Sequence, residues 1–153
     1  MTLNIRRVVT GHNEQGKAIV ASDETLDIAV RRPGQEACVV WATDRVPADN
    51  LDPQDGALRP QGTTLANGVV FRVVRYEPGR TGRMHRTTSL DYGVVISGSI
   101  VLELDDGAEV TLNAGDVLVQ RGTIHNWVSR GEEACTIAFV LVDSTPLPFD
   151  VAS

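Results

Sequence analysis

The sequence predicts an all-β protein that forms a single barrel or sandwich. Short runs rich in β-branched and aromatic residues follow one another along the chain, and turn residues separate them. No segment longer than about one helical turn combines a 3.6-residue apolar period with capping residues. With 153 residues and no second copy of any unit, the chain fits one domain that buries its own core.

The N-terminal part predicts a hairpin, a strand and a long connection. The runs "IRRVVT" and "KAIVAS" flank the polar turn "GHNEQG", and "CVVWATD" reads as a further strand. Residues 45–68 are polar and rich in Pro and Gly. A connection of this length inside a compact domain is usually functional or mobile, so we expect it to cover a pocket mouth or to lie over a partner subunit.

The regular part of the predicted barrel spans residues 69–142. "VVFRVVRY" is a strand that ends at Pro-Gly, and the following runs alternate around Ile100, Leu102 and Leu104. Turns are predicted at "DDGA", "NAGD" and "SRGEE". The tail 143–153 holds two prolines and is expected to be an irregular strap, while residues 1–68 pack on the barrel within the same domain.

Composition excludes several classes of function. A net charge of −6 and a pI near 5.0 argue against nucleic acid as a partner, which requires clustered Lys and Arg. No apolar run approaches the roughly 20 residues that span a bilayer, and no secretory signal opens the chain. Cys38 and Cys135 lie in apolar runs and are expected to be buried free thiols. We therefore expect a cytoplasmic protein that acts on a small-molecule substrate.

Parity along extended segments predicts a site. Residues two apart on a strand share a face. The sets are His85, Thr87, Ser89 and Asp91 in one segment, and His125 and Trp127 in another. Two imidazoles and one carboxylate from His85, His125 and Asp91 suit a divalent metal with open coordination positions, which then acts as a Lewis acid. The same three residues also suit metal-free acid–base catalysis, because burial and neighbouring charges shift pKa values toward neutrality.

These positions resemble the first of the two motifs of the cupin family. Gly79 is followed by five residues and His85, Thr87 stands where the usual second histidine lies, Asp91 stands in place of the usual glutamate, and Gly98 follows. In the second motif, "GDVLVQRGTIH" resembles the run that opens with Gly-Asp and ends on a metal-binding histidine, here His125. The resemblance implies an antiparallel jelly-roll barrel, the cupin double-stranded β-helix, with additional N-terminal strands.

The chain departs from the cupin pattern at several positions. Thr87 stands in place of one usual ligand, and Asp91 is one methylene shorter than the usual glutamate. The loop before His125 has Gln120 and Arg121 where a proline is usual, and Ser129 stands in place of asparagine. The resemblance implies one divalent metal (Zn, Fe, Mn or Ni) on His85, Asp91 and His125, and these departures leave a metal-free site as the alternative.

Other side chains are candidates for substrate contacts. Polar or aromatic residues near the predicted site are Thr87, Ser89, Tyr92 and Trp127. On the strand 69–76, Arg72 can point inward and hold a substrate carboxylate through two parallel hydrogen bonds.

The expected function is a small-molecule enzyme, a lyase such as a dehydratase or an isomerase, acting on a carbonyl-containing metabolite. His85, Asp91 and His125 are its expected catalytic residues. The stretch "HRTTSLDYG" is also loosely similar to cupins of biosynthetic and polyketide-tailoring pathways. The alternatives are an Fe(II)-dependent dioxygenase and a cupin that binds a ligand without catalysis. The resemblance further implies a homodimer, in which a second copy covers exposed sheet edges.

Overall fold

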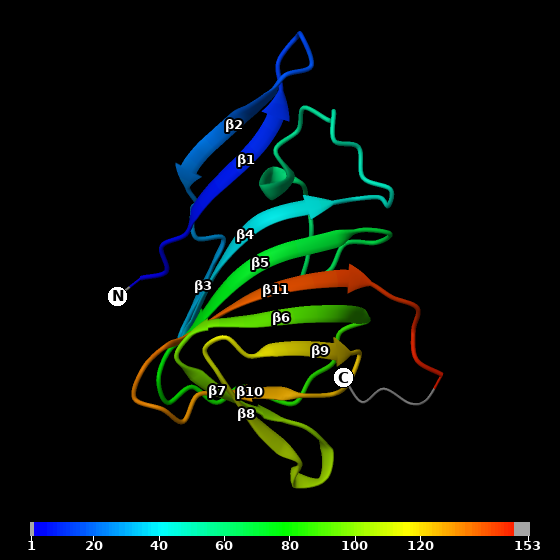
Figure 1. Ribbon diagram of the computed structural model, residues 1–153. Helices are drawn as coiled ribbons and strands as arrows, with labels where there is room; N and C mark the ends of the chain where they lie inside the picture. Colours follow the sequence, from blue (N-terminus) through cyan, green and yellow to red (C-terminus); the bar gives the residue numbers. More distant parts are fainter. Residues whose placement is uncertain (1, 149–153) are drawn as a thin grey trace.

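A computed structural model describes residues 2–148 and confirms the all-β prediction (Figure 1). Eleven strands and two short 3₁₀ turns make up the described part. The strands are β1 (Arg6–His12), β2 (Ala18–Thr25), β3 (Val30–Arg32), β4 (Gln35–Thr43), β5 (Val69–Tyr76), β6 (Ser89–Ser97), β7 (Ser99–Glu103), β8 (Glu109–Asn113), β9 (Val117–Arg121), β10 (Asn126–Val128) and β11 (Cys135–Asp143). The 3₁₀ turns are η1 (Gly56–Leu58) and η2 (Asp105–Gly107).

Two antiparallel sheets form the jelly-roll barrel. The larger sheet has the order β3-β4-β5-β11-β6-β9, and the smaller has the order β10-β7-β8. The segment before β6 runs along β10, where His85 and His125 form an isolated antiparallel bridge and Thr81 pairs with Val128. The two histidines predicted from the motifs therefore lie on neighbouring chain segments.

Alternation along the strands explains the core. On β11 the buried residues are Cys135, Ile137, Phe139 and Leu141, and the residues between them are less buried. These four side chains pack inside the barrel with residues of both sheets, among them Val74, Ile100 and Trp127. Successive side chains of a strand point to opposite faces, so a strand with one face toward the core has an apolar residue at every second position.

The predicted N-terminal hairpin is present and forms a sheet of its own. β1 and β2 pair in antiparallel register and project from the barrel at the top of Figure 1. Arg7 of β1 is buried and ties the hairpin to the barrel: its guanidinium donates to the carbonyl oxygen of Val40 and to the carboxylate of Asp55. β4 pairs with β5 along its length, so residues before position 69 also contribute to the larger sheet. The short strand β3 was not predicted.

The predicted turns separate the strands as expected. "DDGA" joins β7 to β8 through η2, "NAGD" joins β8 to β9, and "SRGEE" joins β10 to β11. Both cysteines are buried free thiols, and burial raises the pKa of Cys135 to about 11. In residues 2–148, no helix has the length and apolar character needed to cross a membrane.

Candidate functional site

The candidate site lies where β6 and β9 face the segment that carries the two histidines. Asp91 on β6 pairs in register with Gln120 on β9, and both side chains point inward and are buried. Ser89 lies two residues before Asp91 on the same strand face. The alternation in "SLDYG" places these two polar residues inside the barrel, as the parity argument predicted.

His85 and His125 lie side by side. Each backbone N–H donates to the carbonyl oxygen of the other residue, at 2.9 Å in both directions. Their ring centroids are 4.4 Å apart, with the ring planes tilted by 55°. His125 is only 3% exposed, whereas His85 is half-buried, so the pair extends from the interior toward solvent.

Backbone carbonyl oxygens determine the tautomer of both imidazoles. The Nδ1 atom of His85 lies 2.9 Å from the carbonyl oxygen of Arg83, and the Nδ1 atom of His125 lies 2.8 Å from that of Thr123. A carbonyl oxygen only accepts hydrogen bonds, so each Nδ1 carries the proton. The Nε2 atom of each ring therefore carries the lone pair in the neutral state, and at His125 this lone pair faces the amide nitrogen of Gln120 at 3.4 Å.

A chain of hydrogen bonds links Asp91 to His125. Thr87 Oγ1 lies 2.9 Å from Ser89 Oγ, and Ser89 Oγ donates to Asp91 Oδ1 at 2.6 Å. Gln120 Nε2 donates to Asp91 Oδ2 at 3.0 Å and lies 3.4 Å from His125 Nε2. Gln120 thus stands between the carboxylate and the imidazole. In the sequence, Gln120 stands out only as a departure from the usual motif, because its position opposite Asp91 depends on the pairing of β6 with β9.

Burial lowers the pKa of His125 below its usual 6.5. Desolvation is the largest cause, and the nearby His85 lowers the pKa further, while the hydrogen bond to Thr123 and the Asp91 carboxylate act in the opposite direction. The neutral form of His125 is therefore favoured at neutral pH.

The predicted metal ligands do not form a three-ligand set in this geometry. Both oxygens of Asp91 already accept hydrogen bonds, from Ser89 and Gln120. Across residues 2–148, no three His, Cys, Asp or Glu side chains are arranged to hold a metal ion. A divalent metal on His85, Asp91 and His125 therefore remains a prediction that the arrangement of these side chains does not favour.

The remaining predicted residues are divided between the interior of the barrel and the outer face of the larger sheet. Trp127 is buried inside, with its ring 5.9 Å from His125 and 5.7 Å from Phe139, so it forms a wall of the interior. Arg72 also points inward, on the same face as Val70 and Val74. The prediction that Tyr92 lies near the site is corrected. Its side chain lies on the outer face and is 47% exposed, because successive residues of a strand alternate between faces and the adjacent Asp91 faces inward. It does not line the interior.

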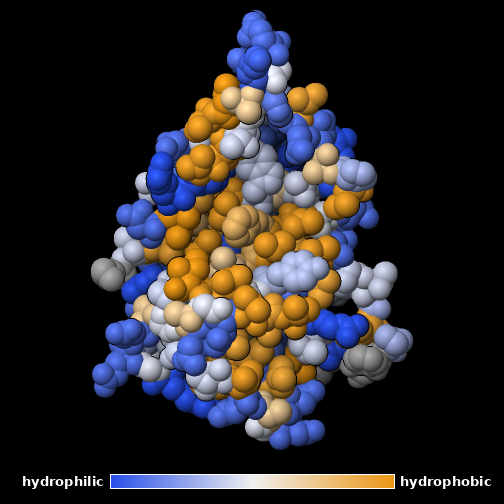
Figure 2. Space-filling view, in the orientation of Figure 1, coloured by the Kyte–Doolittle hydropathy of each residue, from blue (hydrophilic) through white to orange (hydrophobic). Residues whose placement is uncertain are grey.

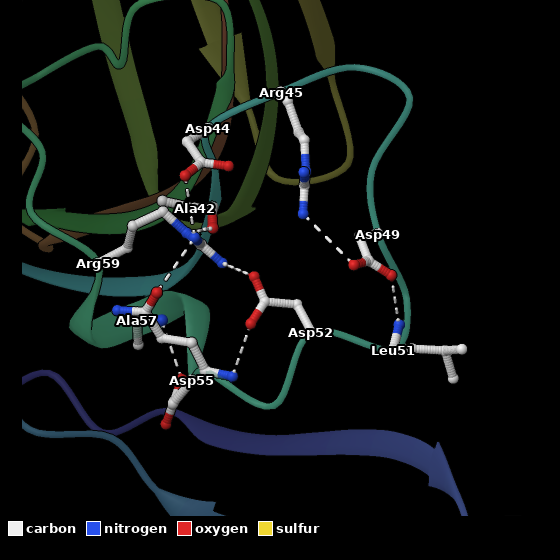
Figure 3. A network of polar contacts seen from close by, with 10 residues as sticks. Ala42, Asp44, Arg45, Asp49, Leu51, Asp52, Asp55, Ala57 and Arg59 are labelled. Atoms are coloured by element: carbon white, nitrogen blue, oxygen red, sulfur yellow. Dashed lines mark hydrogen bonds and ion pairs between the residues drawn. The ribbon is translucent and has the colours of Figure 1, made fainter.

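The long connection 45–68 lines a cavity, but not at the histidines. A cavity of about 790 Å³ lies between this connection, the β1–β2 hairpin and the outer face of β4 and β5. Figure 3 shows how the connection is held: Arg59 donates to the carbonyl oxygen of Ala42 and contacts Asp44 and Asp52. Trp41 and Phe71 contribute the sheet side of the cavity. The expected cover of a pocket mouth is therefore displaced to the side of the sheet opposite His125.

Comparison with known proteins agrees with this architecture. Residues 72–142 match the family model described as "Cupin domain". The chain is 35% identical to "Phomopsin biosynthesis cluster protein C'" of Diaporthe leptostromiformis, over 94% of this chain and 81% of that protein. The chain belongs to the cupin family.

Other relatives of this cupin carry functional names. It is 32% identical to "Cupin-domain-containing oxidoreductase fogC" of Aspergillus ruber, over 90% of this chain and 71% of that protein. Among solved structures, KdgF from Halomonas sp. superposes with a TM-score of 0.53 at 19% identity, covering 76% of this chain and 86% of that one. At this identity the match concerns the fold alone. The relatives named after biosynthesis clusters and cupin domains confirm the resemblance to biosynthetic cupins that the sequence predicted.

Proposed function

We propose that this cupin is a small-molecule enzyme that moves a proton on a carbonyl-containing metabolite, as a lyase of the dehydratase type or as an isomerase. The observation that supports it is the pair of imidazoles whose Nδ1 protons are held by backbone carbonyl oxygens. A neutral imidazole with a fixed tautomer presents one basic nitrogen in a defined direction. Names of relatives from biosynthetic clusters support a metabolite as the substrate.

In this proposal His125 is the general base. Its Nε2 atom removes a proton from the carbon next to the carbonyl group, and burial keeps the ring neutral beforehand. In a dehydration the proton then goes to the departing hydroxyl, and in an isomerisation it returns to a different carbon. His85, at 4.4 Å between ring centroids, is close enough to exchange protons with the same substrate.

Gln120 and Asp91 position the substrate and the base. Asp91 holds the Gln120 amide, which in turn approaches His125 Nε2. The other amide atom, Gln120 Oε1, is buried without a hydrogen-bond partner. An unpaired buried acceptor costs about 1–3 kcal/mol, so a substrate hydroxyl that donates to it gains binding energy and selectivity.

Hydrogen–deuterium exchange tests the proposal without knowledge of the full reaction. β-Hydroxy-carbonyl and 1,3-dicarbonyl compounds are incubated in D₂O with wild type, and deuterium at the α-carbon is measured by mass spectrometry. We expect exchange above buffer with at least one compound class, and a loss of about 100-fold or more in His125→Gln, because general bases contribute about 10²–10⁴ in rate.

A surface variant serves as the control. Arg130→Gln changes an exposed ion pair with Glu109 and is expected to exchange like wild type. Exchange that is unchanged in folded His125→Gln would contradict the proposal. A cupin that only binds its ligand would show no exchange, together with binding that survives the loss of both histidines.

An oxidoreductase is the second candidate. Relatives from Aspergillus ruber and Hypocrea virens, both 32% identical, carry that name. This candidate includes the iron-dependent dioxygenase expected as an alternative, and it predicts oxygen consumption or a change in the oxidation state of the product. Proton transfer by His125 predicts a product of unchanged oxidation state, so mass analysis of the product separates the two.

A homodimer is also part of the proposal. Outward residues of the larger sheet are paired across strands: Phe71 with Val140, Val140 with Tyr92, and Tyr92 with Val119. Figure 2 shows a broad hydrophobic area over the middle of this side of the molecule. The exposed side chains there are Phe71, Tyr92, Val94, Ile96, Val117 and Val119.

The size of this hydrophobic face suits a second copy of the chain. Its six exposed side chains offer on the order of 500 Å², and each partner of a standard interface contributes about 800 Å², a little over half of it apolar. An antiparallel sheet face can pack on its own copy across a two-fold axis, and two such faces stack about 10 Å apart.

A further inference from the structure

Three arginines lie near the inward-facing Tyr76 of the larger sheet: the charges of Arg72 and Arg80 act on Tyr76, and that of Arg32 acts on Arg72. Arg32 pairs in register with Gln35, and Gln35 pairs with Tyr76. Arg72 lies four residues before Tyr76 on the same face of β5. The guanidinium of Arg80 lies 5.0 Å from the centre of the Tyr76 ring. We call Arg32, Arg72 and Arg80 the arginine cluster.

No carboxylate neutralises this cluster among the contacts within residues 2–148. Other arginines, such as Arg7, Arg59 and Arg75, form ion pairs, but Arg32, Arg72 and Arg80 form none there. Arg80 donates instead to neutral acceptors, Gln35 Oε1 at 3.0 Å and the carbonyl oxygen of Trp127 at 3.3 Å. The absence of a carboxylate is notable in a chain with 20 acidic and 14 basic residues.

Arg72 is the least satisfied member of the cluster. It is half-buried, and its Nε atom is buried without a hydrogen-bond partner. Burial lowers the pKa of Arg72, and the positive charge of Arg32 lowers it further. The nearby carboxylates of Glu36 and Glu77 face Arg75 on the opposite side of the sheet. A partly buried cation without a counter-charge is unfavourable unless something supplies the charge.

Trp127 lies between the candidate catalytic site and the part of the arginine cluster next to Tyr76. Arg72 pairs in register with Phe139, and Trp127 packs against Phe139. Trp127 contacts His125 with its ring at 5.9 Å and Tyr76 at 6.4 Å, so this aromatic ring lies between the two sites.

We propose that the arginine cluster binds a small oxyanion, a carboxylate or phosphate group, between the guanidinium groups of Arg72 and Arg80. A planar guanidinium donates two parallel hydrogen bonds to such a group. The buried Nε–H of Arg72 is a donor of this kind, and Arg32 adds positive charge at the exposed side. The inference does not depend on the proton-transfer function.

Nuclear magnetic resonance of the arginine side chains tests this directly. Inorganic phosphate and acetate are titrated at constant ionic strength into ¹⁵N-labelled protein, and the Nε–H signals are followed. We expect saturable shifts of the Arg72 and Arg80 signals with at least one of the two anions, and an anion-dependent rise in Tm, because a ligand of the folded state stabilises it. Phosphate and acetate arms distinguish which oxyanion fits.

Variants at Arg72 test whether the anion response comes from the arginine cluster. Arg72→Gln is expected to raise the Kd by roughly tenfold or more, since a charge-assisted hydrogen bond contributes about 1.5–3 kcal/mol. Arg72→Lys retains the charge without the planar fork, so it is expected to bind more weakly than wild type but better than Arg72→Gln. Arg130→Gln, on the surface, and His125→Gln, in the other site, are both expected to respond like wild type.

Several outcomes would overturn the proposal. They are equal shifts with chloride, no saturable shift with either oxyanion, and an unchanged Kd in folded Arg72→Gln or Arg72→Lys. Because the readout needs no catalysis, a normal anion response in His125→Gln separates this inference from the fate of the proton-transfer proposal.

Discussion

At the scale of single residues, Gln120 determines how the candidate site is connected. Its amide nitrogen bonds Asp91 and approaches His125, so the carboxylate acts on the imidazole through an intervening amide. A direct Asp–His pair would favour a protonated imidazole. With the neutral amide between them, burial of the ring is the largest influence on the pKa of His125 and lowers it, which favours the neutral form.

The pKa of His125 has a consequence for stability. The folded-state pKa lies below 6.5, whereas the unfolded chain keeps an ordinary histidine near 6.5. Between these two values the unfolded chain binds a proton that the folded protein does not. We therefore expect the free energy of unfolding to fall as the pH drops through 6.5, by up to about 1.4 kcal/mol per pH unit from this residue, and this contribution to level off below the folded pKa.

Urea unfolding of wild type and His125→Gln at pH values from about 5 to 8 measures this contribution. All other titrating groups are common to both proteins, so the difference in slope isolates His125. The expected result is a shallower loss of stability in the variant between neutral and mildly acidic pH. Identical slopes would show that the folded and unfolded pKa values of His125 are the same.

At the scale of the elements, glycine positions decide how closely strands approach at their turns. Gly98, between β6 and β7, has a φ of 74°, and a Cβ there would lie 2.2 Å from the carbonyl oxygen of Ala134. Gly107 has a similar φ of 77°, but nothing lies within 4 Å of its added Cβ. The two residues thus share a backbone conformation and differ in crowding.

This pair makes a matched test of the turn. Gly107→Ala should lower the free energy of unfolding by about 1–2 kcal/mol, the usual cost of a left-handed conformation with a side chain. Gly98→Ala should cost roughly 3 kcal/mol or more, since the backbone must also move away from Ala134. Chemical denaturation of both variants checks the order, and equal losses would contradict the close approach.

At the scale of the whole molecule, the larger sheet has an apolar outer side in addition to the side that faces the core. On β9, the polar Gln120 faces inward, whereas the apolar Val117 and Val119 face outward and are 72% and 59% exposed. An antiparallel sheet with one solvated face normally alternates apolar and polar residues, and monomers seldom leave large apolar patches uncovered. This pattern is the reason to propose a second copy on the outer face.

The proposed dimer predicts a mass of twice 16.5 kDa in solution for wild type. Val119→Lys places a charge on the apolar outer face, on the edge strand β9, and should shift the protein to the monomer, because a buried unpaired charge is costly. Light scattering after size-exclusion chromatography measures both. Leu58→Lys, at an exposed position on η1, is the control and should remain dimeric. A wild-type monomer, or dissociation of the control alone, would contradict the interface.

The sequence by itself determined the all-β class, the N-terminal hairpin, the turns, the buried cysteines and the resemblance to cupins. These depend on local signals: period-two alternation, turn residues and motif spacing act within a few residues of the chain. Parity along single strands also showed that Ser89 shares a face with Asp91, and Trp127 with His125.

Only the tertiary structure decided which strands meet and which face is inside. Gln120 became a site residue through its register with Asp91, Tyr92 was found on the outer face, and Arg72 was found in register with Phe139. Pairing between strands far apart in the sequence determines these neighbours, and a shift of one residue in register would reverse every side chain. The chemistry of the site therefore depends on long-range pairing that no local pattern in this chain specifies.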